Sequence, residues 1–91
     1  MDLIKADLTG MNLSSTNLTG ADLTKAKLTR ANLTDTKLSV AYLIEADLTG
    51  AVLTAADVSH ACLSRTTWKN TTCPNGTTNS GTSPCTAEQL L

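Results

Sequence analysis

The sequence feature that most constrains the fold is an apolar residue at every fifth position. The series runs without interruption from residue 3 to residue 68, and all but two of its members are leucine. Its members are Leu3, Leu8, Leu13, Leu18, Leu23, Leu28, Leu33, Leu38, Leu43, Leu48, Leu53, Val58, Leu63 and Trp68. Such regularity indicates an internal repeat with one large buried side chain in each unit.

A second series lies two residues before the first and consists mainly of small side chains. Its members are Ala6, Thr16, Ala21, Ala26, Ala31, Thr36, Ala41, Ala46, Ala51, Ala56, Ala61 and Thr66, with Met1 and Met11 as the exceptions. The unit is therefore A-[DN]-L-[ST]-x, as in 6–10, which reads Ala-Asp-Leu-Thr-Gly.

A period of five fits neither an α-helix at 3.6 residues per turn nor a long uninterrupted strand at 2. Ala and Leu lie two positions apart, which is the strand spacing that points both side chains to the same face. The next inward Ala follows Leu by three residues, so the chain must bend at the intervening pair. Repeated bends of one sense predict an all-β solenoid whose coils hydrogen-bond to one another at ~4.8 Å.

In these units the chain resembles the pentapeptide-repeat family, which is commonest in cyanobacteria. The resemblance covers residues 1–70, with fourteen units in phase. It implies a right-handed quadrilateral β-helix of four units, or twenty residues, per coil, with Leu at the centre of each side and Ala beside it. About three and a half coils are then expected.

The outward charges test the number of sides. A step of twenty residues stacks Asp7 on Lys27 on Asp47, Lys37 on Asp57, and Lys25 on Glu45 on Arg65, against two like-charge neighbours. A step of fifteen residues gives two opposite-charge neighbours and one like pair. Four sides are therefore favoured, although exposed contacts of ~0.2–1 kcal/mol tune the register and do not hold the fold.

The composition limits which residues can form the core and which classes of partner are expected. The chain has 91 residues, no Phe, one Tyr and one Trp, so its core must consist mainly of Leu and Ala. A net charge of −1 provides no basic footprint for nucleic acid, and no apolar run approaches the length of a membrane span. We expect neither nucleic acid as a partner nor a membrane span.

The repeat pattern is interpreted as ending at Asn70, which divides the chain into a β-helix at 1–70 and a C-terminal loop and cap at 71–91. Residues 71–85 are mostly turn formers. Trp68 is expected to cap the C-terminal mouth of the solenoid, the alternative being a surface position. Residues 86–89 have capping-box spacing, which is compatible with a single helical turn or with a frayed tail.

Three cysteines allow three single pairings. Cys62 belongs to the regular wall and points outward, whereas Cys73 and Cys85 bracket the polar loop. We expect a disulfide between Cys73 and Cys85, which would imply an oxidising compartment such as a periplasm or thylakoid lumen, and a removed leader. The alternative is three free thiols in a cytoplasmic protein.

The sequence holds no strong signal for chemistry, and we expect no enzyme, catalytic residue, cofactor or metal. His60 and Cys62 lie close in sequence, but a metal or hydrolytic site needs further convergent groups. The Asp and Asn residues are interpreted as a solvated wall. The glycines at the turn position need no ligand to explain them.

Function is therefore expected to reside in the surface. We expect a non-enzymatic scaffold that binds an unidentified protein or serves a structural role. The alternatives are DNA mimicry directed at gyrase, as in longer relatives, and ice binding through a Thr column that includes Thr9, Thr29 and Thr49. The open first coil, with Met1 and Met11 where later coils carry Ala, also predicts a homodimer through the N-terminal end.

Overall fold

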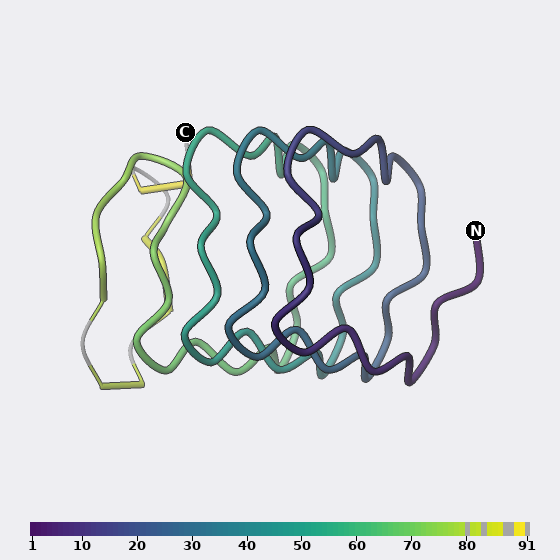
Figure 1. Cartoon of the computed structure of the whole chain (residues 1–91), viewed down its shortest axis with the longest axis horizontal. Helices are drawn as coiled ribbons and strands as arrows, with labels where there is room; N and C mark the ends of the chain where they lie inside the picture. The colour runs from purple at the N-terminus through teal and green to yellow at the C-terminus, as the bar shows by residue number, and fades with distance from the viewer. Residues whose placement is uncertain (80, 83, 87–88, 91) are drawn as a thin grey trace.

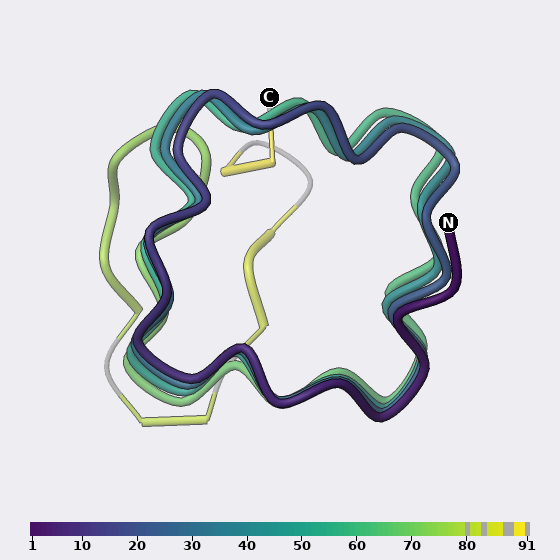
Figure 2. The same cartoon turned by 45° about the vertical axis from the view of Figure 1, so that its right-hand side comes forward.

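The chain winds as a solenoid whose coils stack along the longest axis of the molecule (Figure 1). This computed structural model describes residues 1–79, 81–82, 84–86 and 89–90, and the described chain measures 29 × 23 × 20 Å along its principal axes. In an oblique view the successive coils overlie one another in a four-cornered outline (Figure 2). The overlap shows that each coil repeats the path of the one before it.

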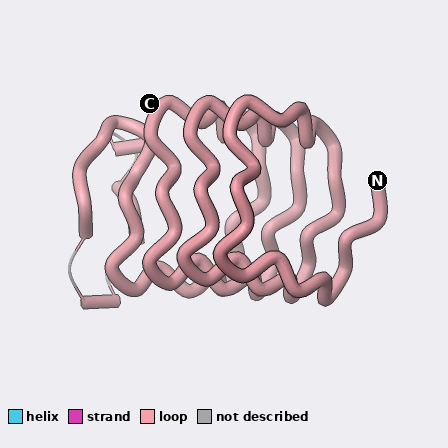
Figure 3. The backbone as a smooth tube through the Cα atoms, in the orientation of Figure 1, coloured by secondary structure: helices cyan, strands magenta, loops and turns pink. Residues whose placement is uncertain are grey.

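Parallel backbone bridges join residues that lie twenty positions apart. They link Asp2 to Asp22, Asp7 to Lys27, Asn12 to Asn32, Asn17 to Lys37, and so on to Val52 with Thr72. The bridges are isolated, and within the described residues no helix or longer strand is assigned, as the uniform colour of Figure 3 shows. A spacing of twenty is four units of five, so the four-sided coil is confirmed over a three-sided one.

Unit 31–35 shows where the five backbone N–H groups of a repeat go. The second, third and fifth N–H groups bond to carbonyls of neighbouring coils: Met11 at 2.9 Å, Val52 at 2.7 Å and Thr54 at 2.9 Å. The first bonds to the carbonyl of Leu28, closing the turn at 3.0 Å, and the fourth bonds to the Asn side chain of its own unit at 3.1 Å. Every donor of the unit is satisfied, as a partly buried backbone requires.

Each corner is a tight turn whose third residue has a positive φ. The angle lies between 53° and 73° at every fifth residue from Lys5 to Asn70, with glycine at Gly10, Gly20 and Gly50. A positive φ confined to the third turn residue is the pattern of a type II turn. The bend inferred from the sequence therefore lies at the two residues after each Leu.

The core is formed by four columns of Leu with Ala beside them. From Leu18 to Val58 all the central residues are buried, and Leu23 through Leu48 have no solvent exposure. Each fully buried Leu contributes roughly 1.5–3 kcal/mol. Thr36 replaces an Ala without leaving a buried polar group unpaired, because its hydroxyl donates to the carbonyl of Leu13 at 2.8 Å.

The wall continues one unit past the boundary expected at residue 70. Thr72 bridges to Val52, and both Thr71 and Cys73 are fully buried. The reason is the register, since Cys73 lies five residues after Trp68 and so takes the next central inward position. Residues 71–75 therefore form a wall unit and are not loop, which corrects the interpretation that the repeat pattern stops at Asn70.

Beyond this unit the chain leaves the wall and turns back. Thr72 pairs with Thr78 in an antiparallel bridge, and Gly76 has a φ of 89° between them. The capping-box spacing forms reciprocal bonds, from Thr86 N–H to Gln89 Oε1 at 2.8 Å and from Gln89 N–H to Thr86 Oγ1 at 3.2 Å. The coil count of about three and a half stays a prediction. So does a complete C-terminal cap, because 80, 83, 87–88 and 91 lie outside the described residues.

A substitution at Val40 tests how much the positive φ at a corner costs in stability. This β-branched side chain is held at a φ of 60° and is 49 % exposed, so its strain is offset by little burial. Asn tolerates positive φ and stands at the equivalent position 70. We expect Val40→Asn to raise the free energy of unfolding by about 1 kcal/mol, measured by chemical denaturation.

Gly20→Val is the matched control, because Gly20 lies at the same corner one coil earlier. A Cβ at Gly20 would meet no atom within 4 Å, so the substitution tests φ without a clash. It should lower the free energy of unfolding. Equal effects of the two substitutions, in either direction, would contradict the corner assignment.

Candidate functional site

The outward Asp and Asn side chains close the turns of their own units. Asp7 Oδ1 accepts a hydrogen bond from the Thr9 N–H at 3.1 Å and from the Thr9 hydroxyl at 2.6 Å. The same pair of bonds occurs at Asn12 with Ser14, Asp22 with Thr24, Asn32 with Thr34, Asp47 with Thr49 and Asp57 with Ser59. These residues are turn clamps, which the expectation of a merely solvated wall missed.

The clamps hold three carboxylates in their charged form. The hydroxyl and then the backbone N–H of Thr9 lower the pKa of Asp7 below the ordinary value of 3.8. Thr24 lowers the pKa of Asp22 in the same way, and Ser59 that of Asp57. Their chemistry is therefore that of hydrogen-bond acceptors and not of general acids.

This arrangement sets the pH dependence of stability. A carboxylate with a lowered folded pKa contributes stability above its unfolded pKa and loses it as the pH falls through the folded pKa. Asn accepts the same bonds without titrating. We therefore expect the variant Asp7→Asn, Asp22→Asn, Asp57→Asn to lose less of its thermal midpoint between pH 7 and pH 3 than the parent loses.

Asp35→Asn provides the control, because the Asp35 side chain makes no such clamp within the described chain. This single variant should follow the parent between pH 7 and pH 3. If the thermal midpoint of the triple variant falls as much as that of the parent, the clamps do not determine the loss of stability at acidic pH.

The outer wall formed by units 1–5, 21–25, 41–45 and 61–65, called wall A, exposes large apolar side chains. Tyr42 is 47 % exposed and is bridged to Asp22 on one side and Cys62 on the other. Ile4 on the same wall is 46 % exposed, and Val40 lies at the corner that leads into it. Wall A is therefore a candidate interaction surface.

A charge ladder borders wall A as the stacking argument predicted. Glu45 Oε2 lies 3.9 Å from Lys25 Nζ, and Glu45 Oε1 lies 3.4 Å from the Arg65 guanidinium. All three side chains are substantially exposed, so the ladder contributes little to stability. It gives the wall a fixed pattern of positive, negative and positive charge.

The structure does not bring His60 and Cys62 into a shared site. Cys62 is a half-buried free thiol whose Sγ lies 3.7 Å from Ser64 Oγ, and the described chain shows no hydrogen bond between Cys62 and His60. His60 acts at a distance on Asp57, where its charge helps to lower the carboxyl pKa. Among the residues described, no three His, Cys, Asp or Glu side chains cluster as a metal site would require. In the same part of the chain no helix is long and apolar enough to traverse a bilayer.

A disulfide joins Cys73 to Cys85 at the C-terminal end, with an S–S distance of 2.02 Å and a sequence separation of 12. Cys73 is fully buried and Cys85 is 7 % exposed. Trp68, the expected cap, is 6 % exposed and belongs to the same core cluster as both sulfurs. The disulfide ties the returning segment to the last wall unit.

The disulfide should contribute about 3 kcal/mol by restricting the unfolded chain. Alkylation of the folded protein without reductant, followed by peptide mass mapping, should label Cys62 only. Labelling of Cys73 and Cys85 would show that these cysteines are free thiols and would contradict the disulfide. Reduction should lower the thermal midpoint, whereas Cys62→Ser should leave it nearly unchanged.

The geometry defines a quadrilateral β-helix built from five-residue units. The family model of pentapeptide repeats matches the chain over residues 2–39 and 31–67. The chain belongs to the pentapeptide-repeat family. No curated protein sequence matches it significantly.

Two solved structures of the family resemble the chain. The pentapeptide repeat protein Rfr23 from the cyanobacterium Cyanothece 51142 is 36 % identical, with a TM-score of 0.76 over 77 % of this chain and 48 % of its own. A pentapeptide repeat protein from the thylakoid lumen of Arabidopsis thaliana is 32 % identical, with a TM-score of 0.55 over 79 % of this chain and 54 % of its own. The chain thus spans about half the length of these proteins, and their fold implies that the β-helix is right-handed.

Proposed function

We propose that the protein is a non-enzymatic scaffold that binds another protein through wall A. The observation that carries this proposal is the exposure of Tyr42, an aromatic side chain on the same wall as the exposed Ile4. Tyr is enriched at interfaces because its ring is apolar while its hydroxyl can stay wet. The backbone beneath it is fixed by the ladder, so binding would order few additional groups.

The charges around Tyr42 add specificity. Lys25, Glu45 and Arg65 alternate in sign along one edge of the wall, and a partner with the complementary pattern would be favoured over others. The exposed corner residue Val40 extends the apolar area on the opposite side. The fitting partner is a protein surface with an apolar centre and an alternating charged rim.

Affinity capture from the lysate of the source organism tests this proposal. The parent should retain a stoichiometric partner that Tyr42→Ser loses. Val52→Ser is the matched control, because Val52 occupies the same bridge position on another wall. A partner retained equally by both variants, or lost equally from both, would contradict binding through wall A.

We further propose that two chains associate through the first coil. Met1 is 72 % and Met11 46 % exposed, and Leu3, Leu8 and Leu13 are only half-buried although their counterparts one coil later are fully buried. Packing two first coils together would bury this apolar rim.

Sedimentation equilibrium tests the homodimer. The parent should dimerise as its concentration rises, and Met11→Ser should weaken the dimer. Tyr42→Ser should leave it unchanged, because Tyr42 lies two coils away from this end. A parent that stays monomeric at high concentration would overturn the proposal.

An oxidising compartment, a periplasm or thylakoid lumen, is the proposed location. The disulfide supports this placement, since such bonds persist mainly where thiols are not kept reduced. The lumenal origin of the Arabidopsis relative is compatible with it. Free thiols at Cys73 and Cys85 in the native protein would favour the cytoplasm instead.

The structure favours neither DNA mimicry nor ice binding as the function. A net charge of −1 does not supply the negative rod that DNA mimicry requires. The hydroxyls of Thr9 and Thr49 donate to their own Asp7 and Asp47 carboxylates, so they serve the turns and do not form a free water-ordering column.

A further inference from the structure

The last coil leaves part of its backbone ladder open. One coil earlier, the N–H groups of Leu38 and Val40 donate to the carbonyls of Asp57 and Ser59 at 2.7 and 2.9 Å. The equivalent donors of the last coil, the N–H groups of Val58 and His60, have no hydrogen-bond partner in the described chain. Val58 itself is only 7 % exposed, so its N–H lies at a sheltered edge.

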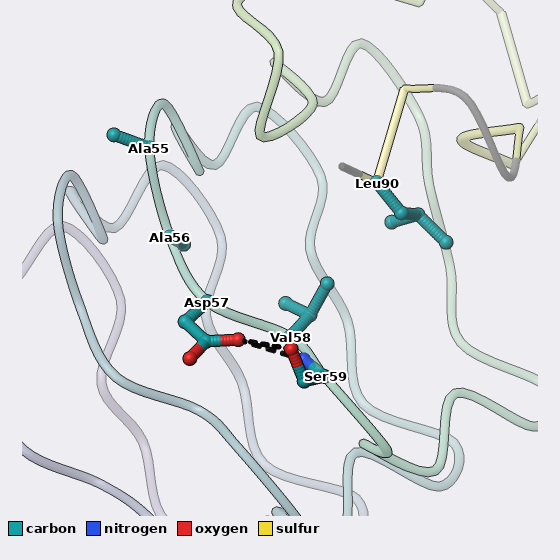
Figure 4. A pocket seen from close by; sticks show the side chains of 6 residues that line it. All are labelled: Ala55, Ala56, Asp57, Val58, Ser59 and Leu90. Carbon is teal, nitrogen blue, oxygen red and sulfur yellow. Dashed lines mark hydrogen bonds between the residues drawn. The ribbon is translucent and has the colours of Figure 1, made fainter.

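The edge is open because the chain turns away before it reaches this wall again. Thr78 pairs antiparallel with Thr72, so residues 76–78 do not continue the wall over Val58. A hollow of about 350 Å³ remains, lined by Ala55, Ala56, Asp57, Val58, Ser59 and Leu90. Figure 4 shows Val58 and Leu90 on opposite sides of this space.

The wall beneath the hollow defines what would fit into it. Its central column is Leu18, Leu38 and Val58, so the next apolar side chain belongs over Val58. Its outward column is Asn17, Lys37 and Asp57, so a cation placed next would continue the alternation. The inward column beneath it holds Thr16, Thr36 and Ala56, so the residue over Ala56 must also be small.

We propose that this edge, called the 56–60 edge, binds an extended peptide of another protein that carries a small–basic–leucine sequence. The peptide adds one parallel strand to the wall. Its carbonyls accept hydrogen bonds from the N–H groups of Val58 and His60. The N–H of its basic residue donates to the carbonyl of Ala56. Strand addition of this kind draws affinity from backbone bonds and specificity from alternate side chains. The site is separate from wall A, and the inference does not rest on the function proposed for that wall.

An NMR titration of the ¹⁵N-labelled protein with acetyl-Ala-Lys-Leu-Thr-Gly-amide tests the proposal. The amide signals of Val58 and His60 should shift and saturate, while those of Tyr42 and the first coil stay in place. A peptide N-methylated at Lys loses the bond to Ala56 and should bind about tenfold more weakly. A peptide with Asp in place of Leu should cause no shift.

Leu90→Ser removes the far side of the hollow and should weaken binding, whereas Tyr42→Ser should not change it. Unchanged signals elsewhere in the spectrum show that each variant is folded. No shift at Val58 and His60, or equal shifts with a scrambled peptide, would overturn the proposal. So would shifts of these two amides with protein concentration alone, because a second copy would then occupy the edge.

Discussion

The structure depends on the parallel backbone ladder between residues twenty positions apart. In every unit from residue 21 to residue 55, three N–H groups join neighbouring coils and one closes the turn, so most of the backbone of these units is satisfied. An ordinary core is marginal in a chain this small, and a solenoid eases this limit because each coil buries the next. The Leu columns supply apolar burial only because the ladder holds them in register.

The fourth N–H of the unit explains why the repeat is A-[DN]-L-[ST]-x. It takes no part in the ladder, and the Asp or Asn two residues earlier accepts its hydrogen bond. The following Ser or Thr hydroxyl adds a second bond to the same oxygen. In the units that carry this pair, two outward side chains with no place in the core thereby stabilise the backbone conformation of the corner.

Much of this fold could be predicted from the sequence, because a period of five with two inward positions per unit admits few backbone paths. The Lys25–Glu45–Arg65 ladder was predictable for the same reason, since it depends on register alone. The turn clamps were missed although the spacing of Asp7 and Thr9 carried the signal. Cys73 was assigned to a loop because it was considered only as half of a disulfide, and its place five residues after Trp68 was overlooked.

The surface is less predictable than the core, because it depends on which units share a wall. Ile4 is distant in sequence from Val40 and Tyr42, and twenty-residue stacking gathers the three at one side of the solenoid. The open 56–60 edge depends on where the chain leaves the wall, which no repeat pattern encodes. Family membership therefore gives the fold, while binding must be read from individual side chains.

The most direct test of this account is the scalar coupling across a ladder hydrogen bond, measured by NMR on the labelled protein. The account predicts a coupling between the amide nitrogen of Leu33 and the carbonyl carbon of Val52, nineteen positions further along the chain. A coupling from Leu33 to Asp47, fourteen positions along the chain, in place of Val52 would indicate a three-sided coil and contradict the account.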